Sequence, residues 1–243
     1  MSEVKRLDLL LIFYVSVSFF GLLTVSVFAL NEPRPGEHVS WMKPLISFLF
    51  SSVCVSGAVA TLFPQKCLTL LGVEETRFPS SFAMKDRSLL AILRSHHPEC
   101  SGFSHHTLAV RGRILCAGCA GLFTGAIIAT IGTILYSFCD WRFDHASLPL
   151  ILFGQIGVFS GFSQMKFKGF LRLALNVFFV LGAYLILIGL NLSGRRISLG
   201  IYFIVLVFFL IWTRILLSRW HHSKICHSCN LDCDVRERYL FSP

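Results

Sequence analysis

The chain has 243 residues, of which 54% are hydrophobic and only 14% are charged. This balance excludes an ordinary soluble domain and favours a membrane protein. The formal net charge is +9, but the sequence has no basic helical face and no separate soluble domain. We therefore expect contact with the lipid bilayer and no binding to nucleic acid.

The hydrophobic residues fall into long uncharged runs. Five of them contain 20 or more residues: Leu9–Leu30, Pro44–Gln65, Ile114–Cys139, Ala146–Met165 and Leu173–Gly194. About 20 apolar residues cross the hydrocarbon as a helix. A sixth run, Ile197–Thr213, has 17 residues, and Ile215–Leu217 extend it if Arg214 reaches its charge back to the interface. The sequence predicts six transmembrane helices, with no charged side chain at membrane depth before Arg214.

The basic residues predict the orientation. With the N-terminus inside, the inner segments 1–8, 64–113, 166–172 and 214–243 hold 17 of the 22 Lys and Arg residues. Lys and Arg are enriched in cytoplasmic loops. We therefore expect a multi-pass protein of the cell membrane with both termini in the cytoplasm. A cleaved signal peptide is not expected, because the first run is too long and no cleavage site follows it.

Two Cys/His motifs lie in the predicted inner segments. In the first, His97-x2-Cys100 is followed by Cys116-x2-Cys119, with 15 residues between the pairs. This is the spacing of a ribbon-type zinc site. We expect His97, Cys100, Cys116 and Cys119 to bind a metal ion, with His105 and His106 as substitutes. Cytosolic thiols remain reduced, so clustered cysteines there indicate metal ligands before disulfides.

The second motif follows the last predicted helix, and its candidate ligands are His222, Cys226, Cys229 and Cys233. Alternatively, the two Cys-x2-Cys pairs share one four-cysteine site. Mixed Cys/His ligands suit zinc, and one or two zinc ions are expected. An iron–sulfur cluster is less favoured, because the fourth nearby Cys and the trailing Pro of ferredoxin sequences are missing.

Short-range patterns predict the structure around the first motif. Thr107–Val110 is a candidate strand, Arg111–Arg113 a tight turn, and a membrane helix is expected to begin near Cys119. Small residues recur along this helix and the next one, which predicts close helix packing. They are Gly121, Gly125, Ala129 and Thr133, then Gly154, Gly157 and Gly161.

The ribbon resembles a family of uncharacterised prokaryotic integral membrane proteins. That family has Cys-His, then Pro-Glu-Arg-Ser-Phe, then Cys-Ala-Arg-Cys-Thr-Gly at the start of a membrane helix. The matching residues here are Pro98, Glu99, Phe103, Gly112, Leu115, Cys116, Ala117, Cys119, Gly121 and Gly125. A weaker match covers Gln155, Gly161, Arg172 and Asn176, with the last two in reversed order. The chain departs from the pattern at Ser95-His96, at Cys100 and at Gly118, where the family has Cys-His, Arg and Arg. The resemblance implies a membrane protein and no defined activity.

These observations predict an all-α polytopic membrane protein with about six transmembrane helices and a small cytoplasmic Cys/His cap that binds metal. Its expected parts are helices in 1–63, a cytoplasmic loop with the metal motif in 64–118, helices in 119–218 and a Cys/His-rich tail in 219–243. The sequence matches none of the common hydrolase or nucleotide-binding motifs. We expect a membrane scaffold, accessory subunit or assembly factor whose zinc-stabilised cap binds a protein partner. The alternatives are a membrane enzyme with lipid or thiol chemistry at the Cys/His cluster, and a metal or small-solute carrier. A closed metal site favours the scaffold, an open metal position the enzyme, and a polar cavity near Gln155, Gln164 and Asn176 the carrier.

Overall fold

The computed structural model describes residues 3–30, 41–62, 106–110, 113–138, 147–192 and 197–228. Within them, six long α-helices account for most of the structure. Their bounds are α1 Glu3–Leu30, α2 Met42–Leu62, α5 Ala117–Phe138, α6 Ser147–Phe162, α7 Gly169–Leu192 and α8 Ile197–Ser228.

All six helical segments are long and apolar enough to cross a membrane. This confirms the prediction of six candidate spans and of a multi-pass membrane protein. Many Phe, Leu, Ile and Val side chains on these helices are exposed, including Phe13, Phe48, Phe153 and Phe208. Such a surface suits contact with lipid, and each helix satisfies its own backbone hydrogen bonds.

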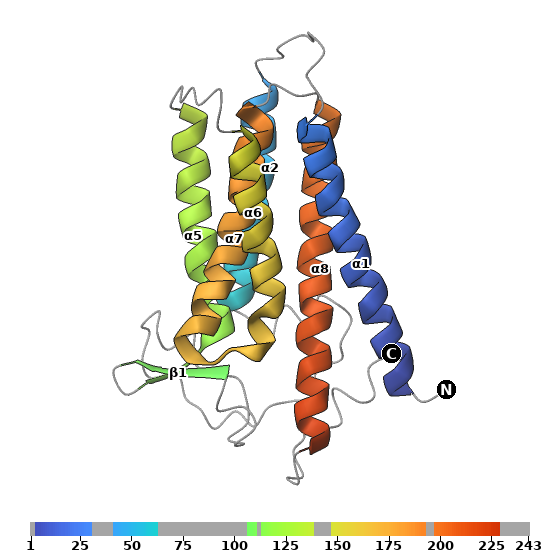
Figure 1. Cartoon of the computed structure of the whole chain (residues 1–243). Coiled ribbons are helices and arrows are strands. Elements are labelled where there is room, and N and C mark those ends of the chain that lie inside the picture. Colours follow the sequence, from blue (N-terminus) through green and yellow to red (C-terminus); the bar gives the residue numbers. More distant parts are fainter. Residues whose placement is uncertain are drawn as a thin grey trace.

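The helices form two groups in contact with each other: α2, α5, α6 and α7 in one, and α1 and α8 in the other. Helix α7 packs against α5 and α6, and α2 packs on α5, while α1 pairs with α8 and also contacts α6. Figure 1 shows that α1 begins and α8 ends at the same end of the bundle, where the short β-hairpin also lies. We call this the hairpin end.

Small residues let α6 and α7 approach closely. A Cβ atom built on Gly154 would lie 2.5 Å from the carbonyl oxygen of Gly182, and one on Gly157 would lie 2.7 Å from that of Phe178. Only a residue without a side chain fits such a contact. Gly121, Gly125, Ala129 and Thr133 of α5 are likewise buried, so the predicted small-residue faces are confirmed.

Polar side chains within the bundle are hydrogen-bonded between helices. Gln155 Nε2 donates to the Leu22 carbonyl oxygen at 2.7 Å, and Ser26 Oγ donates to Gln155 Oε1 at 2.9 Å. These bonds join α6 to α1. Buried polar groups of this kind stabilise packing because their hydrogen-bonding capacity is used within the protein.

The hairpin consists of β1, Thr107–Val110, and β2, Arg113–Cys116. The strands are antiparallel and pair Thr107 with Cys116 and Val110 with Arg113. This confirms the predicted strand Thr107–Val110, whereas Arg113, expected in the turn, begins the second strand. Helix α5 follows directly at Ala117, two residues before the expected start.

Candidate functional site

The junction between β2 and α5 places two cysteines close together. Cys116 is the last residue of β2 and is buried, whereas Cys119 lies in the first turn of α5 and is half-buried. Their side chains are hydrogen-bonded to one another. The sequence imposes this proximity, because a Cys-x2-Cys pair at the start of a helix brings both sulfur atoms to one side of the first turn.

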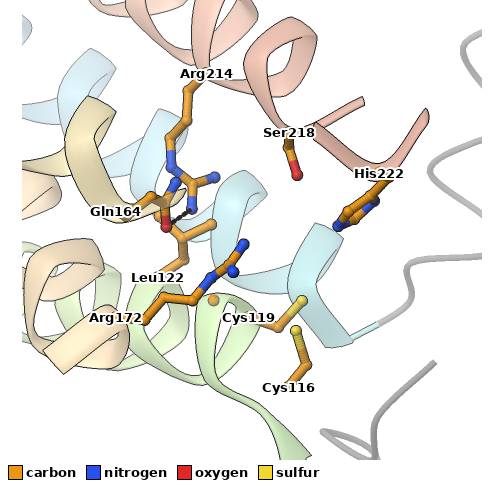
Figure 2. Close-up of a pocket in the computed structure, with 9 residues that line it drawn as sticks. Cys116, Cys119, Leu122, Gln164, Arg172, Arg214, Ser218 and His222 are labelled. Carbon is orange, nitrogen blue, oxygen red and sulfur yellow. Dashed lines mark hydrogen bonds between the residues drawn. The ribbon is translucent and has the colours of Figure 1, made fainter. Parts of the chain in front are cut away.

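A cavity of about 80 Å³ opens beside the two thiols. One water needs roughly 10–15 Å³ measured in this way, so a group larger than water fits. Figure 2 shows side chains from β2, α5, α7, α8 and the 3-10 turn before α7 converging on this space. Besides the two cysteines, Gly118 and Leu122, its lining consists of the polar residues Gln164, Arg172, Arg214, Ser218 and His222.

Arg214 of α8 is held by two neutral amide side chains. Its Nη2 donates to Gln164 Oε1 at 3.3 Å and also to Asn176 Oδ1. If the Gln164 amide is rotated by half a turn, its oxygen lies 3.1 Å from Arg214 Nη2 and its nitrogen donates to Asn176 Oδ1 at 2.6 Å. In both orientations the guanidinium is fixed at the cavity wall without a carboxylate.

Arg172 of α7 is the least satisfied group in the cavity. Its side chain is only 4% exposed, and its Nη2 donates to the sulfur of Met165 at 3.4 Å, a weak acceptor. Its Nε and Nη1 atoms have no hydrogen-bond acceptor within the described residues. Figure 2 shows the guanidinium of Arg172 between the Cys119 sulfur and the Arg214 side chain.

No described carboxylate offsets these two positive charges. The described segments contain two acidic residues, Glu3 and Asp8, both at the start of α1. Asp8 Oδ1 accepts a hydrogen bond from Trp220 Nε1 at 2.6 Å. Burying a guanidinium without a counter-charge costs roughly several kcal/mol. The two arginines therefore make the cavity an attractive site for an anion.

Two local features bring α7 into position. Gly169 has a φ of +50°, which glycine adopts easily, and it begins α7 shortly after the 3-10 turn Ser163–Lys166. Gly121 of α5 touches the backbone of α7: a Cβ atom there would overlap the Leu173 carbonyl oxygen and lie 2.7 Å from Asn176 Cβ. The close contact at Gly121 holds the thiols beside Arg172 and Asn176.

Histidines attach the end of α8 to the hairpin. The ring of His106, just before β1, lies 5.2 Å from the ring of His221 and 5.3 Å from that of His222, measured between centroids. His222 also lines the cavity. His106 and His222, 116 residues apart in the sequence, thus bring the hairpin against a helix that lines the cavity.

Three of the eight predicted metal ligands line this cavity: Cys116, Cys119 and His222. Helix α8 continues to Ser228, so the first residues of the expected tail, including Cys226, have a helical backbone. The other four ligands, His97, Cys100, Cys229 and Cys233, and the substitute His105 lie outside the described residues. In the part of the chain that is described, no three His, Cys, Asp or Glu side chains form a group that could hold a metal ion. Zinc binding stays a prediction that depends on residues beyond these ranges.

Arg172 is a residue of the cavity that the sequence did not predict. We expected it in an inner loop and expected no charged side chain at membrane depth before Arg214. In the structure Arg172 belongs to α7 and is buried. The uncharged run begins at Leu173, whereas α7 begins at Gly169, four residues earlier. A signal was present, because Arg172 and Asn176 belong to the weak part of the family resemblance and both contribute to this site.

Comparison with known proteins identifies no relative. No protein-family model, no curated protein and no solved structure matches the chain. The resemblance to the prokaryotic membrane protein family stays a prediction.

Proposed function

We propose that this membrane protein binds a small anionic group of the phosphate class in the cavity at the hairpin end. The observation that carries the proposal is the pair of guanidinium groups, Arg172 and Arg214, facing one cavity without a described carboxylate. Guanidinium groups bind phosphate with two parallel hydrogen bonds. Nε and Nη1 of Arg172 lie on different edges of the guanidinium, and each leaves a donor for an oxygen of such an anion.

The remaining lining also suits a phosphate. Ser218 and His222 offer a hydroxyl and an imidazole to the same space, and Gln164 and Asn176 fix Arg214 in place. An oxyanion has several acceptor oxygens, so donors on different helices can bind it together. This proposal is closest to the small-solute alternative, because Gln164 lines the polar cavity and Asn176 holds Arg214 at its wall. The scaffold hypothesis stays a prediction, because no described feature identifies a protein partner.

The location of the cavity near the ends of the helices admits two sources of phosphate. It lies where α5 and α7 begin and where α6 and the membrane-crossing part of α8 end. Lipid phosphates occupy this level of a bilayer, and soluble phosphates also reach it. The positive-inside rule places this end in the cytoplasm. Reporter fusions at Phe78 and Pro243 should both report the cytoplasm, and an external signal at either position would reverse the orientation.

The test compares the thermal unfolding of purified protein in inorganic phosphate and in chloride at equal ionic strength. A ligand at 100 times its Kd stabilises the folded state by about 2.7 kcal/mol. Phosphate should raise the Tm of the wild type, and Arg172→Met should abolish that rise. Without phosphate, Arg172→Met should be neutral or stabilising, because it removes an unpaired buried charge.

Lys168→Met is the matched control. It removes the same charge four residues away, but Lys168 is exposed and does not line the cavity. This variant should keep the phosphate response. Nanodiscs with phosphatidic acid or with phosphatidylcholine alone then distinguish a lipid phosphate from a soluble one. An equal rise in Tm with acetate, or the same loss of response in Lys168→Met, would contradict a specific phosphate site.

A further inference from the structure

The two thiols that line the cavity, Cys116 and Cys119, form a pair that has no role in the proposed anion binding. Cys116 and Cys119 are both thiols, not halves of a disulfide, and their side chains are hydrogen-bonded. Figure 2 shows their sulfur atoms next to each other, with the guanidinium of Arg172 beside that of Cys119. Two sulfurs in contact across a Cys-x2-Cys spacing need only a small movement to form a bond.

The surrounding backbone matches a known kind of thiol chemistry. A strand ends at Cys116, and a helix begins at Ala117, so Cys119 lies in its first turn. Cys-x2-Cys pairs at the start of a helix are typical of redox-active dithiols. The guanidinium of Arg172 interacts electrostatically with both sulfurs.

We propose that Cys116 and Cys119 are a redox-active dithiol that exchanges with an external disulfide. This activity goes beyond the binding of an anion and does not require it. The structure supports it through three separate observations: the contact between the sulfurs, their position between strand and helix, and the buried guanidinium of Arg172 beside them.

The exchange is balanced as follows. The thiolate of one cysteine attacks a sulfur of the external disulfide and releases one thiolate, leaving a mixed disulfide on the protein. The second cysteine then attacks the protein sulfur of the mixed disulfide and releases the second thiolate. The two cysteine protons pass to the released thiolates. The protein dithiol is oxidised by two electrons, and the external disulfide is reduced to two thiols.

Burial assigns different roles to the two cysteines. Cys119 is half-buried, whereas Cys116 is only 6% exposed. An external disulfide reaches the more exposed sulfur, so Cys119 makes the first attack. Cys116 resolves the mixed disulfide from within.

The experiment uses the full chain in nanodiscs, equilibrated with mixtures of reduced and oxidised glutathione. Thiols are alkylated with one reagent, disulfides are then reduced, and the new thiols are alkylated with a second reagent. Tryptic cleavage after Arg113 and Arg142 releases a peptide that contains Cys116, Cys119 and Cys139. Tandem mass spectrometry then identifies the reagent on each cysteine. Cys54, a buried thiol in the middle of α2, serves as the control.

We expect Cys116 and Cys119 to change from the first reagent to the second together, at the same glutathione ratio. Cys54→Ala should leave this transition unchanged. Cys116→Ser should accumulate glutathione on Cys119, because the resolving thiol is missing, whereas Cys119→Ser should accumulate at least tenfold less on Cys116.

Three outcomes would overturn the proposal. Independent oxidation of the two cysteines would show that they are not a pair. Equal trapping of glutathione by both single variants would contradict the assigned roles. Stoichiometric zinc that requires Cys116 and Cys119, with a disulfide formed only after chelation, would make the pair a metal site. The phosphate response is measured separately on reduced protein, so failure of the dithiol and failure of the anion site are distinguishable.

Discussion

The middle of the bundle and its hairpin end both bury polar side chains, but these side chains differ in how fully they are hydrogen-bonded. In the middle, the amide of Gln155 uses its nitrogen on the Leu22 carbonyl and its oxygen on Ser26. At the hairpin end, Arg172 is equally buried and charged, yet Nε and Nη1 have no described acceptor. A satisfied polar group stabilises the fold, whereas an unsatisfied charge beside a cavity indicates a ligand.

The contact between α5 and α7 at the hairpin end gives the largest expected effect. In Gly121→Ala the added Cβ overlaps the Leu173 carbonyl oxygen, so α5 and α7 must separate. We expect the free energy of unfolding to fall by about 3 kcal/mol. The phosphate response should also weaken, because the separation moves Asn176 and Arg172.

Gly118→Ala is the control for this change. A Cβ atom at Gly118 would lie 3.9 Å from Cys116 Sγ, an ordinary van der Waals distance. Both substitutions lie in the first turns of α5 and add the same methyl group. Chemical unfolding in mixed micelles measures the difference, and equal stability of the two variants would show that the contact at Gly121 is not rigid.

A smaller effect is expected in the middle of the bundle. Gln155→Leu removes two hydrogen bonds and leaves the Leu22 carbonyl and the Ser26 hydroxyl with one partner fewer. The loss should be about 2 kcal/mol, and it should be the same with and without phosphate. Thermal unfolding under both conditions measures this. A loss of stability that disappears in phosphate would mean that Gln155 is energetically coupled to the cavity and that the two regions are not independent.

The sequence predicted the parts of the fold that depend on local pattern. Apolar runs predicted all six candidate spans, and the pattern at Thr107–Val110 predicted the first strand of the hairpin. Small residues spaced four apart predicted the buried face of α5. Each of these depends on neighbours along one helix or one turn, which is information that a single sequence contains.

The site was predicted only in part, because it joins residues from distant elements. Spacing predicted that Cys116 and Cys119 lie together, but it assigned them to a metal with His97 and Cys100. Nothing in the spacing indicates that Arg172 and Arg214, 42 positions apart, face the same cavity. Nor does it indicate that Gln164 and Asn176 fix Arg214. Helix packing determines these contacts, and the positive-inside rule even gave Arg172 a sufficient explanation as a loop residue.

The smallest expected effect tests whether a polar group affects phosphate binding merely because it lies near the cavity, even when its hydrogen bonds are satisfied. The bond from Trp220 Nε1 to Asp8 Oδ1, 2.6 Å long, joins α8 to α1 within two residues of His222, which lines the cavity. If location alone made polar groups functional, Trp220→Phe would alter the phosphate response. Because this pair satisfies itself, we expect a loss of only about 1 kcal/mol in stability and an unchanged phosphate response. Trp212→Phe, at an exposed position of the same helix, controls for the change of ring. Thermal unfolding of both variants with and without phosphate decides the matter, since a reduced response in Trp220→Phe alone would extend the functional region from the cavity to α1.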